Sequence, residues 1–129
     1  MKLSHIFESR KTSRTVFKYV PRKFERILSK IDVAEVNENR AQLLEVSPQQ
    51  LLSRETEVYD DTVADYQKQF IKTGCFDSPS GYTDESYYPW GIQFGDYIVI
   101  MDGTHRCQAQ LNSGANKIKI HVFQRSDFG

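Results

Sequence analysis

The chain has 129 residues, and its 17 Lys and Arg residues balance 17 Asp and Glu residues. This length suits one domain with a single core, and 39% hydrophobic with 26% charged residues is typical of a globular protein. No apolar run approaches the roughly 20 residues of a membrane-spanning helix, and the N-terminal sequence lacks the apolar segment of a signal peptide. We therefore expect a soluble, cytoplasmic protein that does not insert into membranes.

The cysteines and histidines are too few and too scattered for a disulfide framework or a zinc site. Cys75 and Cys107 form no Cys-x-x-Cys pair. The three histidines, His5, His105 and His121, do not have the spacing of metal ligands. We expect reduced, at least partly buried thiols and no structural metal.

Positive charge is concentrated near the N-terminus. Residues 1–30 hold nine Lys or Arg against Glu8 and Glu25, a net charge of +7, and the other eight basic and fifteen acidic residues give −7. Two interpretations remain open. The segment either binds an anionic partner such as a nucleic acid, or it packs against the acidic remainder of the protein.

The basic segment is predicted to form a strand over residues 14–20 and a helix over residues 21–31, because proline suits the first turn of a helix. Four apolar residues of this helix repeat at helical spacing, namely Phe24, Ile27, Leu28 and Ile31. Four cations lie mostly off that stripe, namely Arg22, Lys23, Arg26 and Lys30. Such a helix binds a nucleic acid or a membrane surface, or it merely places a solvated face above a core face.

The middle of the chain is predicted to contain a strand over residues 42–46 and two helices. A capping-box pattern at residues 47–50 starts a short helix that ends near residue 54. A longer helix follows residues 60–61 and ends at Gly74. The inward side of this helix is expected to carry Val63, Tyr66, Phe70 and Ile71.

Residues 75–90 form a long, turn-rich loop, which is usually functional or mobile. Its aromatic side chains, which include Tyr82, Tyr87, Tyr88 and Trp90, either stack on a base, contact a partner protein or cover one edge of the hairpin that follows. Strands over residues 90–94 and 97–101 form a hairpin. A helix over residues 104–113 and a strand over residues 117–123 complete the chain.

Helices and strands are interspersed, so the sequence predicts an α+β fold with a small mixed sheet. We expect one globular unit, in which a basic strand-helix extension (residues 1–41) packs on a domain formed by residues 42–129.

A turn between the second hairpin strand and the last helix combines residues that suit an anion. The first N–H groups of a helix have no partner inside it, and the helix dipole makes that end slightly positive. Gly103 permits a close backbone approach, while Thr104, His105 and Arg106 lie at the helix start. An arginine fork binds two phosphate oxygens, and a histidine adds a donor or a proton carrier. Alternatively, Asp102 merely caps the helix and Arg106 pairs with a carboxylate.

The stretch "YIVIMDGTHRCQAQLNSGANKIKIHVF" (97–123) resembles the signature of the ParB/sulfiredoxin superfamily, in which a strand leads into Asp-Gly-x-His-Arg and a helix. Upstream, "LLEVSPQQLLSRE", "YDDTVADYQKQFIKTG" and "YPWGIQFGDYIVI" resemble the family's opening strand, a helix ending in glycine and a proline-led hairpin. The resemblance covers residues 42–123.

This resemblance implies a site for a nucleotide or another phosphorylated ligand. Its phosphates would contact Gly103, Thr104, His105 and Arg106, with Arg54 as the matching upstream arginine. Asp102, together with Glu55 or Glu57, would position a magnesium ion that arrives with a nucleoside triphosphate. If the protein is an enzyme, the resemblance implies phosphoryl transfer or phosphoester hydrolysis, with Asp102, His105 and Arg106 as the catalytic residues.

The chain also departs from the family pattern. Thr104 stands where sulfiredoxins have their cysteine, and the helix-turn-helix of partition proteins is missing, so neither of these activities is expected. The Asp-Gly-x-His-Arg form is closer to stand-alone members, which include small-molecule kinases and ParB-like nucleases. Two alternatives remain open: a nucleic-acid-binding protein or nuclease that uses residues 1–30, and a protein-interaction module whose nucleotide site is vestigial.

Overall fold

A computed structural model describes residues 11–33, 38–78, 83–84 and 87–128. Its centre is a six-stranded sheet with the order β2-β4-β9-β8-β10-β3. The strands of this sheet are β2 (Lys18–Tyr19), β3 (Gln42–Val46), β4 (Leu51–Ser53), β8 (Trp90–Phe94), β9 (Tyr97–Asp102) and β10 (Ile118–Gln124). Two antiparallel pairs lie beside it, formed by β1 (Thr12–Arg14) with β5 (Glu57–Tyr59) and by β6 (Phe76–Asp77) with β7 (Thr83–Asp84).

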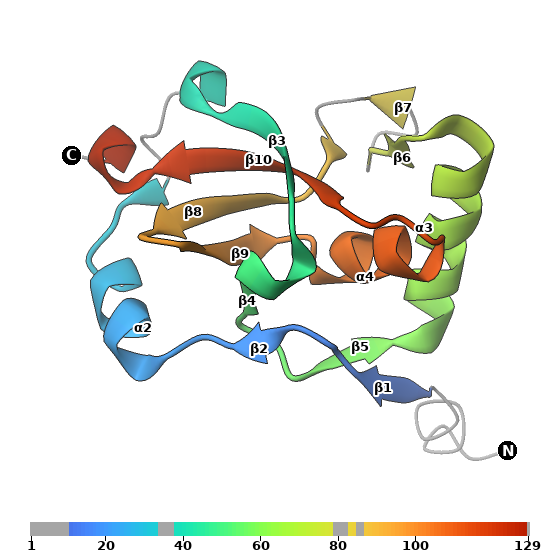
Figure 1. Ribbon diagram of the computed structural model, residues 1–129, viewed down its shortest axis with the longest axis horizontal. Helices are drawn as coiled ribbons and strands as arrows, with labels where there is room; N and C mark the ends of the chain where they lie inside the picture. The colour runs from blue at the N-terminus through green and yellow to red at the C-terminus, as the bar shows by residue number, and fades with distance from the viewer. Residues whose placement is uncertain (1–10, 34–37, 79–82, 85–86, 129) are drawn as a thin grey trace, which may run out of the picture.

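The described residues include three α-helices, namely α2 (Arg22–Leu28), α3 (Asp60–Thr73) and α4 (Thr104–Asn112). Short 3-10 turns are η2 (Glu38–Arg40), η3 (Pro48–Gln50) and η5 (Arg125–Phe128). Helices α2 and α3 lie toward opposite ends of the sheet, and α4 lies beside α3 (Figure 1). The mixed α+β class predicted from the sequence is confirmed. None of the described helices is long and apolar enough to cross a membrane.

The sheet is mixed, and its pairing brings separate strand ends together. Strand β4 pairs in parallel with both β2 and β9, β8 pairs in parallel with β10, and the β8–β9 and β10–β3 pairs are antiparallel. Parallel strands end at the same edge of a sheet, so the residues after β4 and those after β9 are neighbours. The Arg54 guanidinium is accordingly 3.9 Å from the Met101 sulfur.

The two faces of the sheet are covered by separate hydrophobic clusters. On one face, Cys107 of α4 packs with residues of β4, β9 and β10, including Leu51, Ile98 and Ile120. On the other face, Leu28 of α2 packs with Leu52, Val99 and neighbouring residues. A third cluster joins α3 to α4 around Phe76 and Ala109. The central strands are therefore buried on both faces, as is usual where parallel pairs are present.

Several predicted elements are confirmed by the structure. Strand β3, the β8–β9 hairpin, α3 with its left-handed Gly74 cap, α4 and β10 lie where the sequence placed them, to within a few residues. Along β10, Ile118, Ile120 and Val122 share the buried face, as their alternation predicted.

Other predictions at this level were wrong. The helix expected over residues 48–54 is only the η3 turn, although its capping box is present, and the chain then enters β4. Leu51 and Leu52 fill opposite faces of the sheet, and this burial outweighs the local helix signal. The strand expected over residues 14–20 is divided into β1 and β2, because the chain pairs first with β5 and then with β4. Ile71, expected to face inward, is 66% exposed.

Candidate functional site: the turn before helix α4

The turn singled out in the sequence joins the central strand β9 to the N-terminus of α4. Gly103 is the N-cap residue and adopts a left-handed conformation with φ of 107°. The first helical hydrogen bond runs from the Cys107 N–H to the Gly103 carbonyl oxygen over 2.9 Å. The N–H groups of the first turn therefore have no acceptor within the helix, and they lie at the positive end of its dipole.

Glycine is required at residue 103 for two reasons. Its positive φ is unfavourable for residues that carry a side chain. In addition, a Cβ atom at this position would lie 2.6 Å from the Pro89 Cβ and 2.9 Å from the Arg106 Nη2. The backbone of the turn is thus enclosed on one side by the residue that precedes β8 and by the arginine of its own helix.

The Arg106 side chain is buried and makes several contacts around this turn. Its Nη2 is 3.2 Å from an Asp102 carboxylate oxygen, and its Nη1 donates a 2.5 Å hydrogen bond to the Tyr87 carbonyl oxygen. The guanidinium also lies over the Tyr87 ring at 4.0 Å and near the Tyr66 ring at 6.0 Å. Arg106 is therefore a fixed part of the turn, held by Asp102 and by Tyr87.

His105 is attached to β5. Its Nε2 accepts a 3.0 Å hydrogen bond from the Tyr59 N–H, and the two rings stack at a centroid distance of 6.0 Å. Because Nε2 is the acceptor, the neutral ring carries its proton on Nδ1. The turn is therefore connected both to β5, through His105, and to residues before β8, through Arg106.

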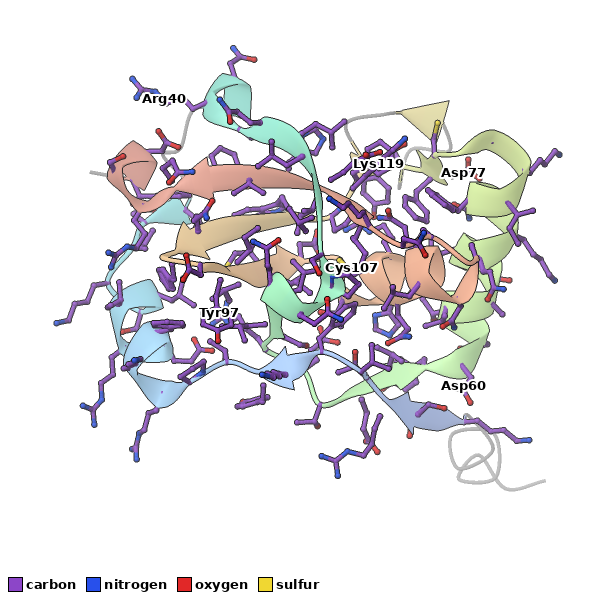
Figure 2. All side chains as sticks on the ribbon, in the orientation of Figure 1. Arg40, Asp60, Asp77, Tyr97, Cys107 and Lys119 are labelled. Carbon is purple, nitrogen blue, oxygen red and sulfur yellow. The ribbon has the colours of Figure 1, made fainter. Side chains whose placement is uncertain are left out.

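The other residues of the turn differ sharply in burial. Thr104 and Cys107 are buried, whereas the Asp102 side chain is 65% exposed. Burial raises the pKa of the Cys107 thiol strongly above its usual range, and the nearby Arg106 charge opposes this only in part. Cys107 lies in the core between α4 and the sheet (Figure 2), so its thiol is not a nucleophile of the turn.

Arg54 and Glu55, the upstream residues of the predicted site, have different surroundings. Arg54 binds the Glu25 carboxylate of α2 with two 2.9 Å hydrogen bonds while also contacting Met101, the neighbour of Asp102. The Glu55 side chain is exposed, and no ion pair or hydrogen bond described here joins it to Asp102. The structure thus brings Arg54 near the end of β9 but gives it a carboxylate partner.

A resident metal site is not formed by the described residues, which contain no group of three or more His, Cys, Asp or Glu side chains able to hold an ion. Magnesium bound with a nucleotide requires only one or two carboxylates, because phosphate and water oxygens complete its shell. The exposed carboxylate of Asp102 meets that requirement.

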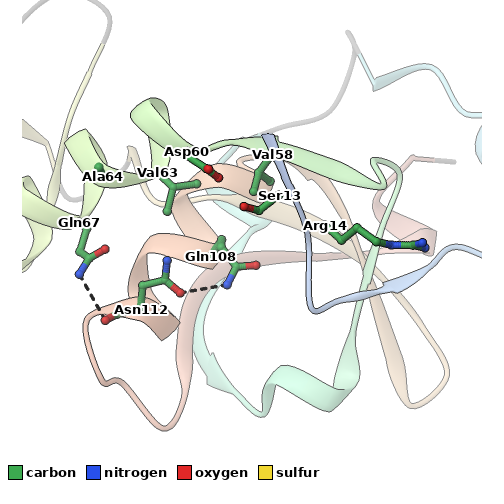
Figure 3. Close-up of a pocket in the computed structure, with 9 residues that line it drawn as sticks. All are labelled: Ser13, Arg14, Val58, Asp60, Val63, Ala64, Gln67, Gln108 and Asn112. Carbon is green, nitrogen blue, oxygen red and sulfur yellow. Dashed lines mark hydrogen bonds between the residues drawn. The ribbon is translucent and has the colours of Figure 1, made fainter. Parts of the chain in front are cut away.

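A cavity of about 300 Å³ is bordered by α4, α3 and the β1–β5 pair (Figure 3). It is lined by Ser13, Arg14, Val58, Asp60, Val63, Ala64, Gln67, Gln108 and Asn112. Gln108 and Asn112 follow His105 at helical spacing, so the three residues share one side of α4. The Gln108 Nε2 donates to the Asn112 side-chain oxygen over 3.1 Å, and the Gln67 Nε2 donates to the Asn112 carbonyl oxygen over 3.3 Å.

Sequence reasoning did not single out Gln108 or Asn112. A signal was available, because polar residues at positions 105, 108 and 112 recur on one side of a helix that is otherwise largely apolar or small. Gln108 also accepts hydrogen bonds from the Thr15 hydroxyl (3.2 Å) and the Val16 N–H (3.3 Å). It thereby fastens the basic N-terminal segment to α4.

A second cavity of about 400 Å³ lies between α3 and Tyr87, on the side of Arg106 that faces its two aromatic neighbours. It is lined by Thr62, Asp65, Tyr66, Gln69, Asp77, Ser78 and Tyr87. Burial and a side-chain hydrogen bond with Tyr87 raise the pKa of Tyr66. Its phenol is therefore neutral at physiological pH and donates or accepts hydrogen bonds beside the Arg106 guanidinium.

The chain was compared with protein-family models, curated proteins and solved structures, and none of these matches it.

Proposed function

We propose that the protein is a ParB/sulfiredoxin-like domain that binds a nucleotide or another phosphate-bearing ligand at residues 102–106. One observation carries the proposal. A central strand passes through a left-handed Gly103 directly into α4, and the Arg106 guanidinium folds back to within 2.9 Å of the place where a Gly103 side chain would begin. The N–H groups of the first turn of α4, which have no acceptor within the helix, and the positive charge of Arg106 therefore lie at the same turn.

The physical case for phosphate rests on three contributions at one place. Backbone N–H groups of the first helical turn point toward an incoming oxygen. The helix dipole adds a partial positive charge there. The Arg106 charge is buried, so its field is screened less than that of a surface cation. Asp102 neutralises part of this charge, so a ligand with two or more negative charges is favoured over a weak anion.

The same residues can be assigned catalytic roles if the protein is an enzyme that acts on the bound ligand. Arg106 would stabilise negative charge that develops on a phosphoryl group. The Nδ1 of His105 is the ring atom that would hold the proton, since Nε2 accepts from Tyr59. Asp102 would hold a magnesium ion bound with the nucleotide, which would neutralise phosphate charge. The chain resembles family members with phosphotransferase or hydrolase activity. We therefore include in the proposal that the protein catalyses phosphoryl transfer or phosphoester hydrolysis.

The test is a thermal-shift panel of ATP, CTP, GTP, their diphosphates and inorganic phosphate, each with and without magnesium. A ligand at 100 times its Kd stabilises a protein by about 2.7 kcal/mol, which corresponds to several degrees in a domain of this size. Arg106→Lys and Arg40→Lys form a matched pair, because both keep the charge and lose the planar fork. Arg40 lies far from α4 and pairs with Asp127 at 3.7 Å (Figure 2).

We expect at least one nucleotide to raise the Tm of the wild type and of Arg40→Lys. The shift should fall by more than half in Arg106→Lys. Equal shifts in the two variants would contradict the assignment of the site to this turn, and the lack of any shift with the whole panel would contradict phosphate binding itself.

A further inference from the structure

The N-terminal segment presents a row of cations that form no ion pair with the described residues of the protein. Residues 11–30 contain seven basic residues, all with exposed side chains, namely Lys11, Arg14, Lys18, Arg22, Lys23, Arg26 and Lys30. We name this set the basic edge. The same residues include one acid, Glu25, and its carboxylate is bound by Arg54.

The backbone of this segment is built into the fold, which fixes where the cations point. Strand β1 pairs with β5, and β2 pairs with β4, so the segment runs along one side of the molecule (Figure 1). Phe17, Val20 and Leu28 are buried and hold the segment to the core. Cations between these anchors therefore face solvent, and Arg14 extends away from the other residues that line its cavity (Figure 3).

Ion pairs in the described part of the chain involve Arg40, Arg54 and Arg106, and none includes a residue of the basic edge. The cations of the basic edge therefore form an outward-facing surface on the described part of the N-terminal segment.

We infer that the basic edge binds the phosphate backbone of a single-stranded nucleic acid. Seven cations along two short strands and a helix match a linear polyanion, because each neutralised phosphate releases a condensed counterion. Tyr19 is 58% exposed on β2, an edge strand of the sheet, and it lies between Lys18 and Arg22 in the sequence. An exposed aromatic ring among cations provides a surface on which an unpaired base stacks.

An anionic membrane fits these observations less well. A helix that binds a membrane surface inserts its apolar side among the lipids. In α2 that side is already used, because Phe24 and Leu28 pack into the protein core. The inference is also independent of the proposed nucleotide site, since it uses no residue of the turn at 102–106.

The test is fluorescence anisotropy with a labelled 20-nucleotide single strand of mixed sequence, the matching duplex, and vesicles containing phosphatidylserine. The variant Arg22→Gln/Lys23→Gln/Arg26→Gln removes three cations of α2. The control Lys68→Gln/Lys72→Gln/Lys117→Gln removes three exposed cations elsewhere and has the same net charge. A second pair compares Tyr19→Ser with Tyr97→Ser, since Tyr97 is an exposed tyrosine at 40% outside the basic edge.

We expect the α2 variant to bind the single strand at least tenfold more weakly than the wild type, and the control to change by less than about threefold. The slope of log K against log salt should become shallower by about 2 in the α2 variant, because each lost contact contributes about 0.7. Tyr19→Ser should weaken binding about fivefold or more, and Tyr97→Ser should leave it unchanged.

Three results would overturn the inference. Equal losses in the two triple variants would show only a general charge effect. Tighter binding of the duplex would remove the single-strand assignment. Binding of vesicles without binding of any oligonucleotide would assign the edge to a membrane surface.

Discussion

The carboxylate of Asp102 and the guanidinium of Arg106 are 3.2 Å apart, one helical turn from each other, with side-chain exposures of 65% and 4%. The pair spans the turn in which β9 becomes α4, so one partner is in water and the other is in the protein. In this arrangement Asp102 is the accessible residue of the site, and Arg106 is the buried residue that contacts it. It also predicts that the buried Arg106 depends on its ion-pair partner for stability more than the solvated Asp102 does.

Replacement of Asp102 should destabilise the protein because it leaves a buried cation without its carboxylate. We expect Asp102→Ala to lower the free energy of unfolding by about 2–3 kcal/mol. In an Arg106→Met background, the same substitution should cost less than about 0.5 kcal/mol, because Asp102 is solvated and has lost its partner. Urea denaturation of the four proteins measures this coupling. Equal costs in both backgrounds would show that Asp102 acts on stability by another route.

A side chain at residue 103 should be far more harmful than one at residue 114, although both glycines have positive φ. Gly114→Ala meets no atom within 4 Å, so only the backbone cost of about 1–2 kcal/mol applies. Gly103→Ala adds the contact with Pro89, which costs a further 1–3 kcal/mol or so. Chemical denaturation of both variants tests this difference, and equal losses would contradict the packing of Pro89 on the turn.

Thiol reactivity should distinguish the two cysteines. Cys75 is partly exposed, whereas Cys107 is buried and its pKa is raised. A thiol reagent should therefore label one cysteine in the native protein and both in urea, and mass spectrometry of tryptic peptides should assign the native label to Cys75. Rapid native labelling of Cys107 would show that α4 separates readily from the sheet.

Alkaline pH should destabilise the protein through Tyr66. Its raised pKa means that the folded state holds the phenol proton more tightly than the unfolded state does. The stabilisation is complete below the unfolded pKa of about 10 and is lost as pH rises toward the folded value. Urea unfolding at pH 9, 10 and 11, in a Cys107→Ala background that removes the raised pKa of that thiol, should show a smaller loss of stability with pH for Tyr66→Phe. The same slope in both proteins would contradict this role of Tyr66.

The sequence predicted an element correctly wherever a single local pattern, such as a hydrophobic periodicity or a capping glycine, specified it. The alternation in β10 and the glycine after α3 are examples, since each has a direct local cause. Residues 51–53 could not be assigned in this way, because their strand conformation depends on β2 and β9, which are distant in sequence. A capping box followed by two leucines is compatible with both a helix and a buried strand.

The site shows the same division. Gly103, Arg106 and Asp102 lie together because they are neighbours in the sequence, and the turn chemistry predicted their proximity. The contacts of Arg106 with Tyr87 and of His105 with Tyr59 join residues far apart in the chain, and no local pattern specifies them. The expectation that Glu55 or Glu57 joins Asp102 at a magnesium ion likewise concerns residues far apart in the chain, and their spacing in the sequence does not show whether they meet.

Phosphate binding at the turn before α4 is tested most directly by a ¹⁵N–¹H correlation spectrum titrated with the nucleotide that gives the largest thermal shift. The proposed function predicts that the largest amide shifts occur at Gly103, Thr104, His105 and Arg106, because their N–H groups would donate to phosphate oxygens. Residues of the basic edge should move much less with a mononucleotide. Saturable binding with the largest shifts elsewhere, and unchanged amides at residues 103–106, would contradict the proposed site.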